Sequence, residues 1–421
     1  MPKKPMTSAQ KILARVSGKD FVEPGEVIWV DPDLLIMYAF PTLTDEFARI
    51  LKEDLHVPIR KPNKCKLFID HMMPPAGVKE SEFHQLTRDW AAELGVELID
   101  NLGIGHQVTA ELGWAKPGMF IAHSDLHVQP LGAFNVLTVS LLTDIITPYA
   151  LGKFWMQVPE TIRIELKGHF SEGIGGRDLI NRILGDLGPD GGLNTVLEFV
   201  GEGAENMSID DRMTSLSEVV FCGAYGGIYP AGKVVDDFLV GRTDTPYEAA
   251  VSDIGAQFLR TLTYDLSKLE PTLVAPSGLT SAISIEEAEG LPVNQGYIGS
   301  CASGRVTDLE IAAKILRGKK IKDSVRLYVV PSSKEILAQV SRSGVLADLV
   351  EAGAFISSPS CDYCYGKVQS IHAGERAIST GTLNVPGRLG STEAEIYLSG
   401  AAVVASSVLT GEITDPRKFL R

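Results

Sequence analysis

Three cysteines in the C-terminal part of the chain have the spacing that most clearly suggests chemistry. Cys301 stands alone after a Gly-Ser pair, and Cys361 and Cys364 form a Cys-x-x-Cys pair further along. Iron-sulfur clusters are normally held by four cysteine thiolates, so three can hold three irons of a [4Fe-4S] cluster and leave the fourth iron open. An open metal position is what Lewis-acid catalysis needs. The spacing therefore predicts a [4Fe-4S] cluster with one iron not ligated by cysteine.

Zinc or plain thiols also fit these three cysteines on spacing alone. Zinc sites usually have a second close cysteine pair or a histidine partner. The only histidine after Cys301 is His372, eight residues past Cys364. A disulfide or structural thiols are the remaining interpretation. Cys65 and Cys222 lie outside the triplet, and we expect them to be buried, unreactive thiols.

The composition is that of an ordinary globular protein. The 421 residues are enough for two or three domains, and 44% are hydrophobic and 22% charged. A net charge of −14 argues against a nucleic-acid partner. No stretch reaches the roughly 18 uncharged apolar residues of a membrane span, and Met1 to Lys11 lacks the apolar run of a signal peptide. Five cysteines, a low and odd count, fit a cytoplasmic location.

Short apolar runs alternate with helical patterns along the chain, which predicts an α/β fold with parallel sheets covered by helices. Thr7 and Gln10 form a capping box for a helix from Thr7 to Val16 that ends near Gly18. The next strands and helices are expected over Glu26–Val30, Cys65–Asp70, Glu80–Leu94, Val96–Ile99, Val136–Ile145, Thr161–Leu166 and Asp178–Leu187. Further helices are expected over Leu309–Leu316, Glu335–Glu351 and Glu395–Leu409, the last opened by a Thr392/Glu395 capping box.

The strand ends are the expected location of function in such a fold. Asp70 and His71 stand at the end of the run that begins at Cys65. The clusters of glycine are interpreted as turns, because the chain contains no phosphate-binding glycine motif. A loop-rich passage starting at Ala275 places a domain boundary near residues 270–290.

Several stretches of the chain resemble the aconitase superfamily. Gly299-Ser300-Cys301-Ala302-Ser303-Gly304-Arg305, followed by Asp308, resembles the G-S-C-T-N-G-R…D stretch of that superfamily, and the nearest branch is the large subunit of 3-isopropylmalate dehydratase-type hydro-lyases. The other matching stretches, in the same order, are Asp70-His71-Met72-Met73-Pro74, Gly105-His106-Gln107, Leu131-Gly132-Ala133-Phe134, Val158-Pro159-Glu160-Thr161, Cys361 with Cys364, and Gly387-Arg388. The resemblance covers essentially the whole chain.

This resemblance implies three fused α/β/α domains with a [4Fe-4S] cluster at their junction. We place the domains at residues 1–160, 161–280 and 281–421, with the cluster cysteines in the third. The resemblance further implies a hydro-lyase, a dehydratase or isomerase acting on a small hydroxy acid. A separate small subunit would supply a swivelling fourth domain and the serine base that removes a proton from the substrate carbon.

The resemblance also assigns roles to individual residues. A carboxylate bonded to an imidazole raises its basicity and fixes its tautomer, which suits proton transfer. The residues assigned to proton transfer are Asp70, His71, His106, Asp125 and His127. Each also has an ordinary interpretation, as a strand-end pair, a loop histidine or a local Asx turn, and the nearby His123 is an alternative. Substrate binding is assigned to Ser303, Arg305, Asn384 and Arg388, and metal binding to Cys301, Cys361 and Cys364.

The chain departs from the superfamily pattern at positions that would bind substrate. The usual D-S-H-T is Asp125-Leu126-His127-Val128, and Leu383 stands where an arginine is usual. Phe221 replaces a carboxylate, and Met37-Tyr38 replaces a His-Asp pair. Polar, anion-binding groups thus give way to apolar ones. We therefore expect an atypical, less polar pocket and a hydroxy acid whose far end is uncharged.

Two other functions remain open from the sequence. One is a cluster-dependent lyase that removes a different leaving group, such as a thiol. The other is a non-catalytic iron-sulfur sensor, which would need only the three thiolates. Because the aspartates and histidines are retained beside the thiolates, we expect a hydro-lyase. The net charge and the lack of a long apolar stretch predict no nucleic-acid and no membrane partner.

Overall fold

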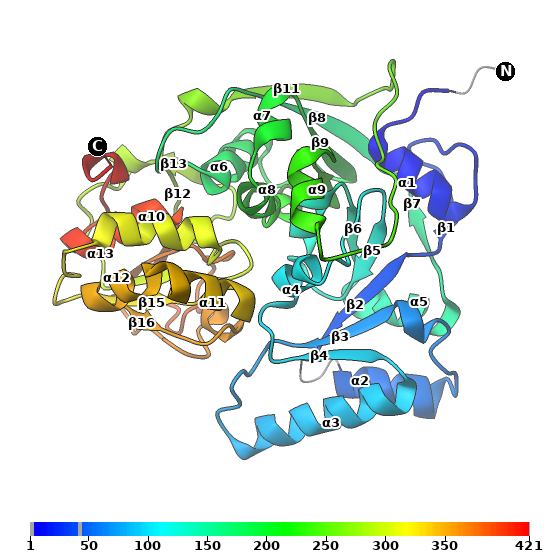
Figure 1. The fold of residues 1–421 in the computed structure, drawn as a ribbon, viewed down its shortest axis with the longest axis horizontal. Coiled ribbons are helices and arrows are strands. Elements are labelled where there is room, and N and C mark those ends of the chain that lie inside the picture. Colours follow the sequence, from blue (N-terminus) through cyan, green and yellow to red (C-terminus); the bar gives the residue numbers. More distant parts are fainter. Residues whose placement is uncertain (1–3, 41–43, 421) are drawn as a thin grey trace.

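The computed structural model describes residues 4–40 and 44–420. Three β-sheets, mostly parallel, form the framework, and helices pack against them (Figure 1). The predicted α/β fold is thereby confirmed. Among the helices of the described residues, none is both long and apolar enough to cross a lipid bilayer.

The first sheet contains five parallel strands in the order β4-β3-β2-β5-β6. These strands are β2 (Leu34–Tyr38), β3 (Cys65–Ile69), β4 (Glu97–Asp100), β5 (Phe120–His123) and β6 (Leu137–Ser140). A separate antiparallel ribbon pairs β1 (Val27–Val30) with β7 (Phe154–Gln157). The helices of this part are α1 (Ser8–Ser17), α2 (Thr44–Arg49), α3 (Val78–Leu94), α4 (Gly105–Glu111) and α5 (Ile146–Leu151).

The second sheet contains four parallel strands in the order β10-β9-β8-β11. These are β8 (Glu160–Lys167), β9 (Thr195–Val200), β10 (Gly226–Ile228) and β11 (Arg260–Asp265). Its helices are α6 (Gly176–Leu187), α7 (Glu202–Asn206), α8 (Ile209–Leu216) and α9 (Lys233–Leu239). One continuous apolar core includes Ile36 of β2 and Ile164 of β8, so the first two sheets are packed together.

The third sheet has the order β13-β12-β18-β17-β14-β15-β16, in which β12 and β13 are antiparallel. Its strands are β12 (Thr272–Val274), β13 (Ala282–Ser284), β14 (Gln295–Ile298), β15 (Arg326–Val329), β16 (Phe355–Ile356), β17 (Arg376–Ser379) and β18 (Glu395–Leu398). Its helices are α10 (Val306–Leu316), α11 (Lys334–Ser343), α12 (Val345–Ala352) and α13 (Ala401–Thr410). This part has an apolar core of its own and lies to one side in Figure 1, largely yellow to red. The domain boundaries stay a prediction.

The first helix forms as its sequence predicts, because its ends are specified locally. The Thr7 side chain accepts a hydrogen bond from the backbone of Gln10, and the Gln10 side chain accepts one from the backbone of Thr7. Gly18 ends the helix in a left-handed conformation with φ of 70°, which glycine adopts without steric cost.

Two predicted helices were wrong in extent. The helix expected over Glu335–Glu351 is broken at Gly344, whose φ is 86°, into α11 and α12. The apolar pattern continues through the break because both helices face one core. The helix expected over Glu395–Leu409 is β18 followed by α13, which begins after Gly400. Pairing with β17 determines the strand, and this pairing is not visible in a uniformly apolar sequence.

Candidate active site

The ends of three strands bring the predicted functional residues together. Asp70 directly follows β3, Asp125 follows β5, and Cys301 follows β14, so residues of the first and third sheets meet at one junction. The backbone N–H of Cys361 donates to the Asp70 carbonyl over 3.0 Å. The charge of Asp125 affects Cys301 and that of Asp70 affects Cys361, so carboxylates and thiols share one buried region.

Asp70 and His71 form a hydrogen-bonded pair. The Asp70 carboxylate lies 2.8 Å from His71 Nδ1, and its other oxygen accepts the Gly105 N–H at 2.9 Å. A side chain at Gly105 would collide with the rings of Tyr38 and Phe68, so this close approach requires glycine. Burial alone would lower the pKa of His71, but the charge and hydrogen bond of Asp70 outweigh burial and raise it. This imidazole is therefore prepared to carry a proton.

Asp125 lies between two imidazoles. Its Oδ1 is 3.5 Å from His106 Nε2 and 3.4 Å from His127 Nδ1, and it accepts the His127 N–H at 2.6 Å. The Asx turn considered from the sequence thus exists together with the imidazole contacts. Despite burial, the two imidazoles hold the pKa of Asp125 well below its usual range.

Tyr38 completes the environment of His106, and the sequence analysis missed this role. Its phenol oxygen lies 2.8 Å from His106 Nδ1, and its ring meets the imidazole edge-on. His106 therefore has a partner at each nitrogen, Tyr38 on one side and Asp125 on the other. The available signal in the sequence was the position of Tyr38 at the end of an apolar run, β2, which lies between β3 and β5 in the sheet.

His123, the alternative to His106 and His127, lies in a different environment from theirs. It is fully buried, and within residues 4–40 and 44–420 neither ring nitrogen has a hydrogen-bond partner. Burial lowers the pKa of His123 to about 3. Burial therefore favours the neutral form of His123, and the imidazoles that contact the Asp125 carboxylate are those of His106 and His127.

The three cysteines converge from two loops of the third sheet. Cys301 and Cys364 are buried, Cys361 is half-buried, and no disulfide joins them. Burial raises the pKa of Cys301 and Cys361 well above the usual range, and neighbouring negative charges act in the same direction. Thiolates bind metals, and metal coordination deprotonates thiols, so these side chains can become thiolates by binding a metal.

Cys364 differs because cationic and polar groups face it. Arg388 donates to the Cys364 carbonyl at 2.9 Å and to its sulfur at 3.3 Å, and the Thr382 hydroxyl lies 3.6 Å from the sulfur. Burial opposes the effect, but Arg388 and Thr382 lower the pKa of Cys364. Arg388, predicted to bind substrate, thus contacts a predicted metal ligand.

The other residues predicted to bind substrate are all buried. Arg305 donates to Gln107 Oε1, Thr214 Oγ1 and the Cys301 carbonyl, so its guanidinium is used in protein contacts. Asn384 donates to the Ala275 carbonyl at 2.5 Å. In the part of the chain that the structure describes, Asn384 Oδ1 and the Ser303 hydroxyl have no partner. Ser303 and Asn384 therefore have free hydrogen-bonding capacity, whereas Arg305 holds the cysteine loop.

Known proteins match the chain over most of its length. Residues 63–411 match the aconitase family (aconitate hydratase). The chain is 37% identical to 3-isopropylmalate dehydratase large subunit 2 of Rubrobacter xylanophilus, covering 98% of each protein. It is 35% identical to 3-isopropylmalate dehydratase large subunit 1 of Methanopyrus kandleri, covering 98% of this chain and 99% of that protein.

The chain belongs to the aconitase family. It is a hydro-lyase of the aconitase type, as the sequence predicted. Among solved structures, Thermococcus kodakaraensis aconitase X in its holo-form matches with a TM-score of 0.45 and 16% identity over 89% of each chain, a likeness too weak to carry an argument.

Membership of the aconitase family implies a [4Fe-4S] cluster, and the residues at the junction fit one. Three cysteine sulfurs supply the usual donor atoms. Near them, the hydroxyls of Ser303 and Tyr297 and Nε2 of His127 are buried without a partner among the described residues. No three metal-ligating side chains in the described ranges are grouped around a single point. Each cysteine of a cluster binds a different iron, so a cluster does not require such grouping.

A buried ion pair beside the cysteines was also missed by the sequence analysis. Arg177 lies 2.9 Å from Glu218, and it donates to the carbonyls of Thr380 and Gly381. Burial raises the pKa of Glu218 to about 7, against the charges of Arg177 and His127. The stretch that appeared to have lost its carboxylate therefore places one near the site. A glutamate within an apolar run is the signal that was available.

Phe221, the residue that replaces the usual carboxylate, packs edge-on against His127 with ring centroids 6.0 Å apart. Leu126, which precedes His127 in the chain, is 41% exposed. One apolar ring, that of Phe221, therefore contacts His127.

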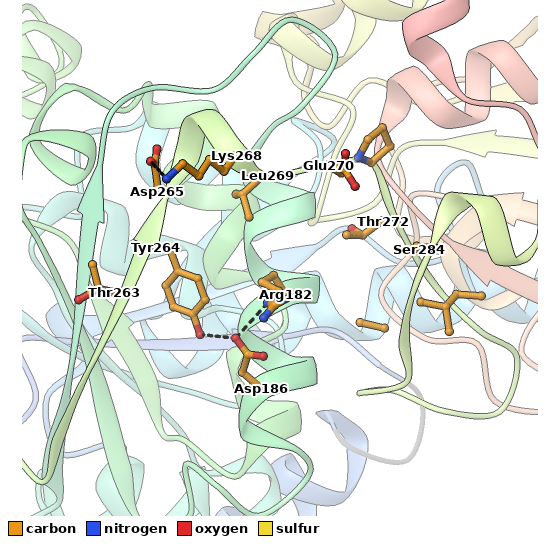
Figure 2. A pocket seen from close by; sticks show the side chains of 13 residues that line it. Arg182, Asp186, Thr263, Tyr264, Asp265, Lys268, Leu269, Glu270, Thr272 and Ser284 are labelled. Carbon is orange, nitrogen blue, oxygen red and sulfur yellow. Dashed lines mark hydrogen bonds and ion pairs between the residues drawn. The ribbon is translucent and has the colours of Figure 1, made fainter.

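A cavity of about 440 Å³ lies elsewhere, between α6, the end of β11 and the β12–β13 hairpin (Figure 2). Arg182 and Tyr264 both contact Asp186 in it. None of the predicted site residues lines this cavity.

Proposed function

We propose that this chain is the large subunit of a [4Fe-4S]-dependent hydro-lyase that acts on a small hydroxy acid together with a separate small subunit. The observation that carries the proposal is the meeting of three cysteines, two buried and one half-buried, with two carboxylate–imidazole groups at one junction. The relatives are named as large subunits, which supports a small-subunit partner. A cytoplasmic location stays a prediction.

Cys301, Cys361 and Cys364 would hold the cluster. Cys222 and Cys65 lie in two apolar cores, away from the residues of the junction, so we do not expect either to be a fourth ligand. One iron would then have no cysteine ligand. When bound, the cluster supplies a Lewis acid that polarises the carbon–oxygen bond to be broken.

His71 is suited to give a proton to the departing hydroxyl. Its Nδ1 faces Asp70, so its Nε2 is the atom left to donate. Against the effect of burial, the charge and hydrogen bond of Asp70 raise the pKa of His71, which favours the protonated imidazole that a general acid needs. The Asp125 group, with His106 and His127, would hold the substrate hydroxyl or a second proton. The small subunit would supply the base for the neighbouring carbon.

The substrate would have an uncharged far end. Phe221 packs against His127, Leu126 precedes His127 in the chain and is partly exposed, and Leu383 stands where the superfamily resemblance expects an arginine. Arg388 is the remaining cation for a carboxylate, and it also contacts Cys364. One carboxylate beside Arg388 and an apolar group against Leu126 would fit this arrangement.

The test is a hydration and dehydration assay of the reconstituted chain with its small subunit. Citrate, 3-isopropylmalate and 2-hydroxy acids with one carboxylate and an alkyl end would be compared under anaerobic conditions. We expect the highest kcat/KM for the acids with the alkyl end. Full activity on citrate, with none on the alkyl acids, would contradict the proposed pocket.

A further inference from the structure

Asp362 lies between the two cysteines of the Cys-x-x-Cys pair, and its carboxylate accepts hydrogen bonds from residues both inside and outside this turn. Its two oxygens accept the N–H groups of Met72 and Met73, each at 2.8 Å. It also accepts the hydroxyls of Ser360, at 2.6 Å, and Tyr365. The side chain is 3% exposed, so these bonds are made away from water, where each is most effective.

The two backbone donors belong to the loop that carries His71. Met72 has a φ of 59°, a left-handed conformation that is sterically unfavourable for a non-glycine residue. Two successive N–H groups aimed at one anion form an anion-binding concavity of the backbone. The Asp362 carboxylate fills it and stabilises the conformation of the residue that follows His71.

Asp362 also fixes a ring beside the imidazole. The Tyr365 hydroxyl bonds to Asp362, and the Tyr365 ring centroid lies 5.8 Å from that of His71. Phe40 also contacts His71, edge-on with ring centroids 5.3 Å apart. The Asp362 carboxylate thus determines both the backbone that follows His71 and one of the two aromatic rings that contact it.

We propose that Asp362 is a positioning residue, which fixes the place of the His71 imidazole relative to the Cys361–Cys364 turn. The Cys-x-x-Cys turn belongs to the third sheet and His71 to the first, and the Asp362 bonds, with the Cys361 N–H to the Asp70 carbonyl, join them. The proposal rests on the proposed function for its effect on turnover, but the geometric link stands without it.

The test compares Asp362→Asn with Tyr365→Phe and a matched control. Asparagine keeps the size but places an amide N–H against a backbone N–H, so one of the two Met72–Met73 bonds is lost. Tyr365→Phe removes only the phenol bond. Asp415→Asn is the control, because Asp415 accepts the Arg417 N–H in another short turn of the third sheet.

The first readout is the imidazole carbon–proton NMR signal of His71 in metal-free protein. We expect it to move in Asp362→Asn, to move less in Tyr365→Phe, and to stay unchanged in Asp415→Asn. After reconstitution, Asp362→Asn should keep the iron content of the wild type and lose roughly 10- to 100-fold in kcat with KM unchanged.

An unmoved His71 signal in Asp362→Asn would overturn the proposal, whatever the activity. Loss of iron with an unmoved signal would show that Asp362 serves the cysteine turn alone. Because the NMR readout needs neither cluster nor substrate, it decides this proposal even where the hydro-lyase proposal fails. If Asp362→Asn does not fold, the same signal in Tyr365→Phe decides.

Discussion

The junction has two sides, the aspartates and histidines of the first sheet and the cysteines of the third. They differ in whether their buried ionisable groups have partners that stabilise the charged form. On the side of the first sheet, Asp70 bonds to His71, and Asp125 lies between His106 and His127. These pairs are complete within the protein itself. On the side of the third sheet, burial and mutual repulsion raise the pKa of Cys301 and Cys361 well above the usual range.

This difference shows that the two halves have different requirements. The carboxylate–imidazole side is already assembled as a set of proton donors and acceptors by its own hydrogen bonds. On the cysteine side, Cys301 and Cys361 need a metal to compensate the charge of their thiolates, whereas Arg388 already favours the thiolate of Cys364. We therefore expect substitutions on the two sides to separate metal content from turnover.

Replacing the cysteines should have the largest effect. Each of Cys301→Ser, Cys361→Ser and Cys364→Ser should lose bound iron and essentially all activity, because each thiolate would hold one iron. Cys65→Ser and Cys222→Ser are matched controls, since both are buried thiols outside the triplet. Iron and sulfide per chain, counted after anaerobic reconstitution, are the measurement. Full iron content in any of the three variants would remove that cysteine from the ligand set.

Asp125→Asn should affect turnover and leave the iron in place. The amide cannot hold the charges of His106 and His127, so proton transfer should slow by roughly 100- to 10,000-fold, the usual range for general acid–base groups. Steady-state kinetics with the iron count for the same sample are the measurement. A proportional loss of iron and activity would show that Asp125 serves the cysteine side.

Leu383→Arg should change substrate preference rather than turnover. An added guanidinium near Thr382 and Arg388 can pair with a second carboxylate, and a charged hydrogen bond of this kind contributes roughly 1.5–3 kcal/mol. We expect kcat/KM to rise about tenfold or more for a dicarboxylic hydroxy acid relative to an alkyl one. Leu383→Lys, with one charge and no planar fork, is the control and should gain less. An unchanged ratio would place Leu383 outside the substrate pocket.

The smallest expected effects are on how the free energy of unfolding depends on pH. His123 and His71 should change this dependence in opposite directions. The pKa of His123 is lowered to about 3, so its contribution is present above pH 6.5 and lost as the pH falls below it. His123→Leu should therefore lose about 1 kcal/mol less stability than the wild type between pH 8 and pH 5.5. The pKa of His71 is raised, so its pairing stabilises below pH 6.5 and is lost as the pH rises through the raised value.

Urea unfolding at pH 5.5 and pH 8 measures the pH-dependent contributions of His123 and His71 to the free energy of unfolding. His71→Gln should be destabilised more at pH 5.5 than at pH 8, the reverse of His123→Leu. The metal content must be the same in all samples. Equal pH dependence in wild type and His123→Leu would mean that the buried imidazole is not held neutral.

Local signals in the sequence predicted much of the fold. The capping box of Thr7 and Gln10 and the stop at Gly18 lie within a few residues of each other, so α1 could be recognised directly. The boundary between β18 and α13 could not, because the stretch after Glu395 is uniformly apolar and its strand exists through pairing with β17. Local patterns specify helix ends, whereas sheet partners are distant.

The residues of the site also fall into those with a local sequence signal and those without one. Asp70, His71 and the cysteines follow predicted strands or motifs, and the structure brings them together. Tyr38 contacts His106 across 68 positions of sequence, and Glu218 meets Arg177 through the packing of α6 on the segment after α8. Neither pairing has a local signature, so only the tertiary structure reveals these partners.

The most direct test of the account is the iron stoichiometry and EPR spectrum of the wild-type chain, reconstituted anaerobically and then mildly oxidised. If three cysteines hold a [4Fe-4S] cluster with one iron that no cysteine ligates, the sample will contain about four irons per chain. Oxidation will then release one iron and give a three-iron EPR signal. One tightly bound zinc, or a cluster that keeps all its iron on oxidation, would contradict the account.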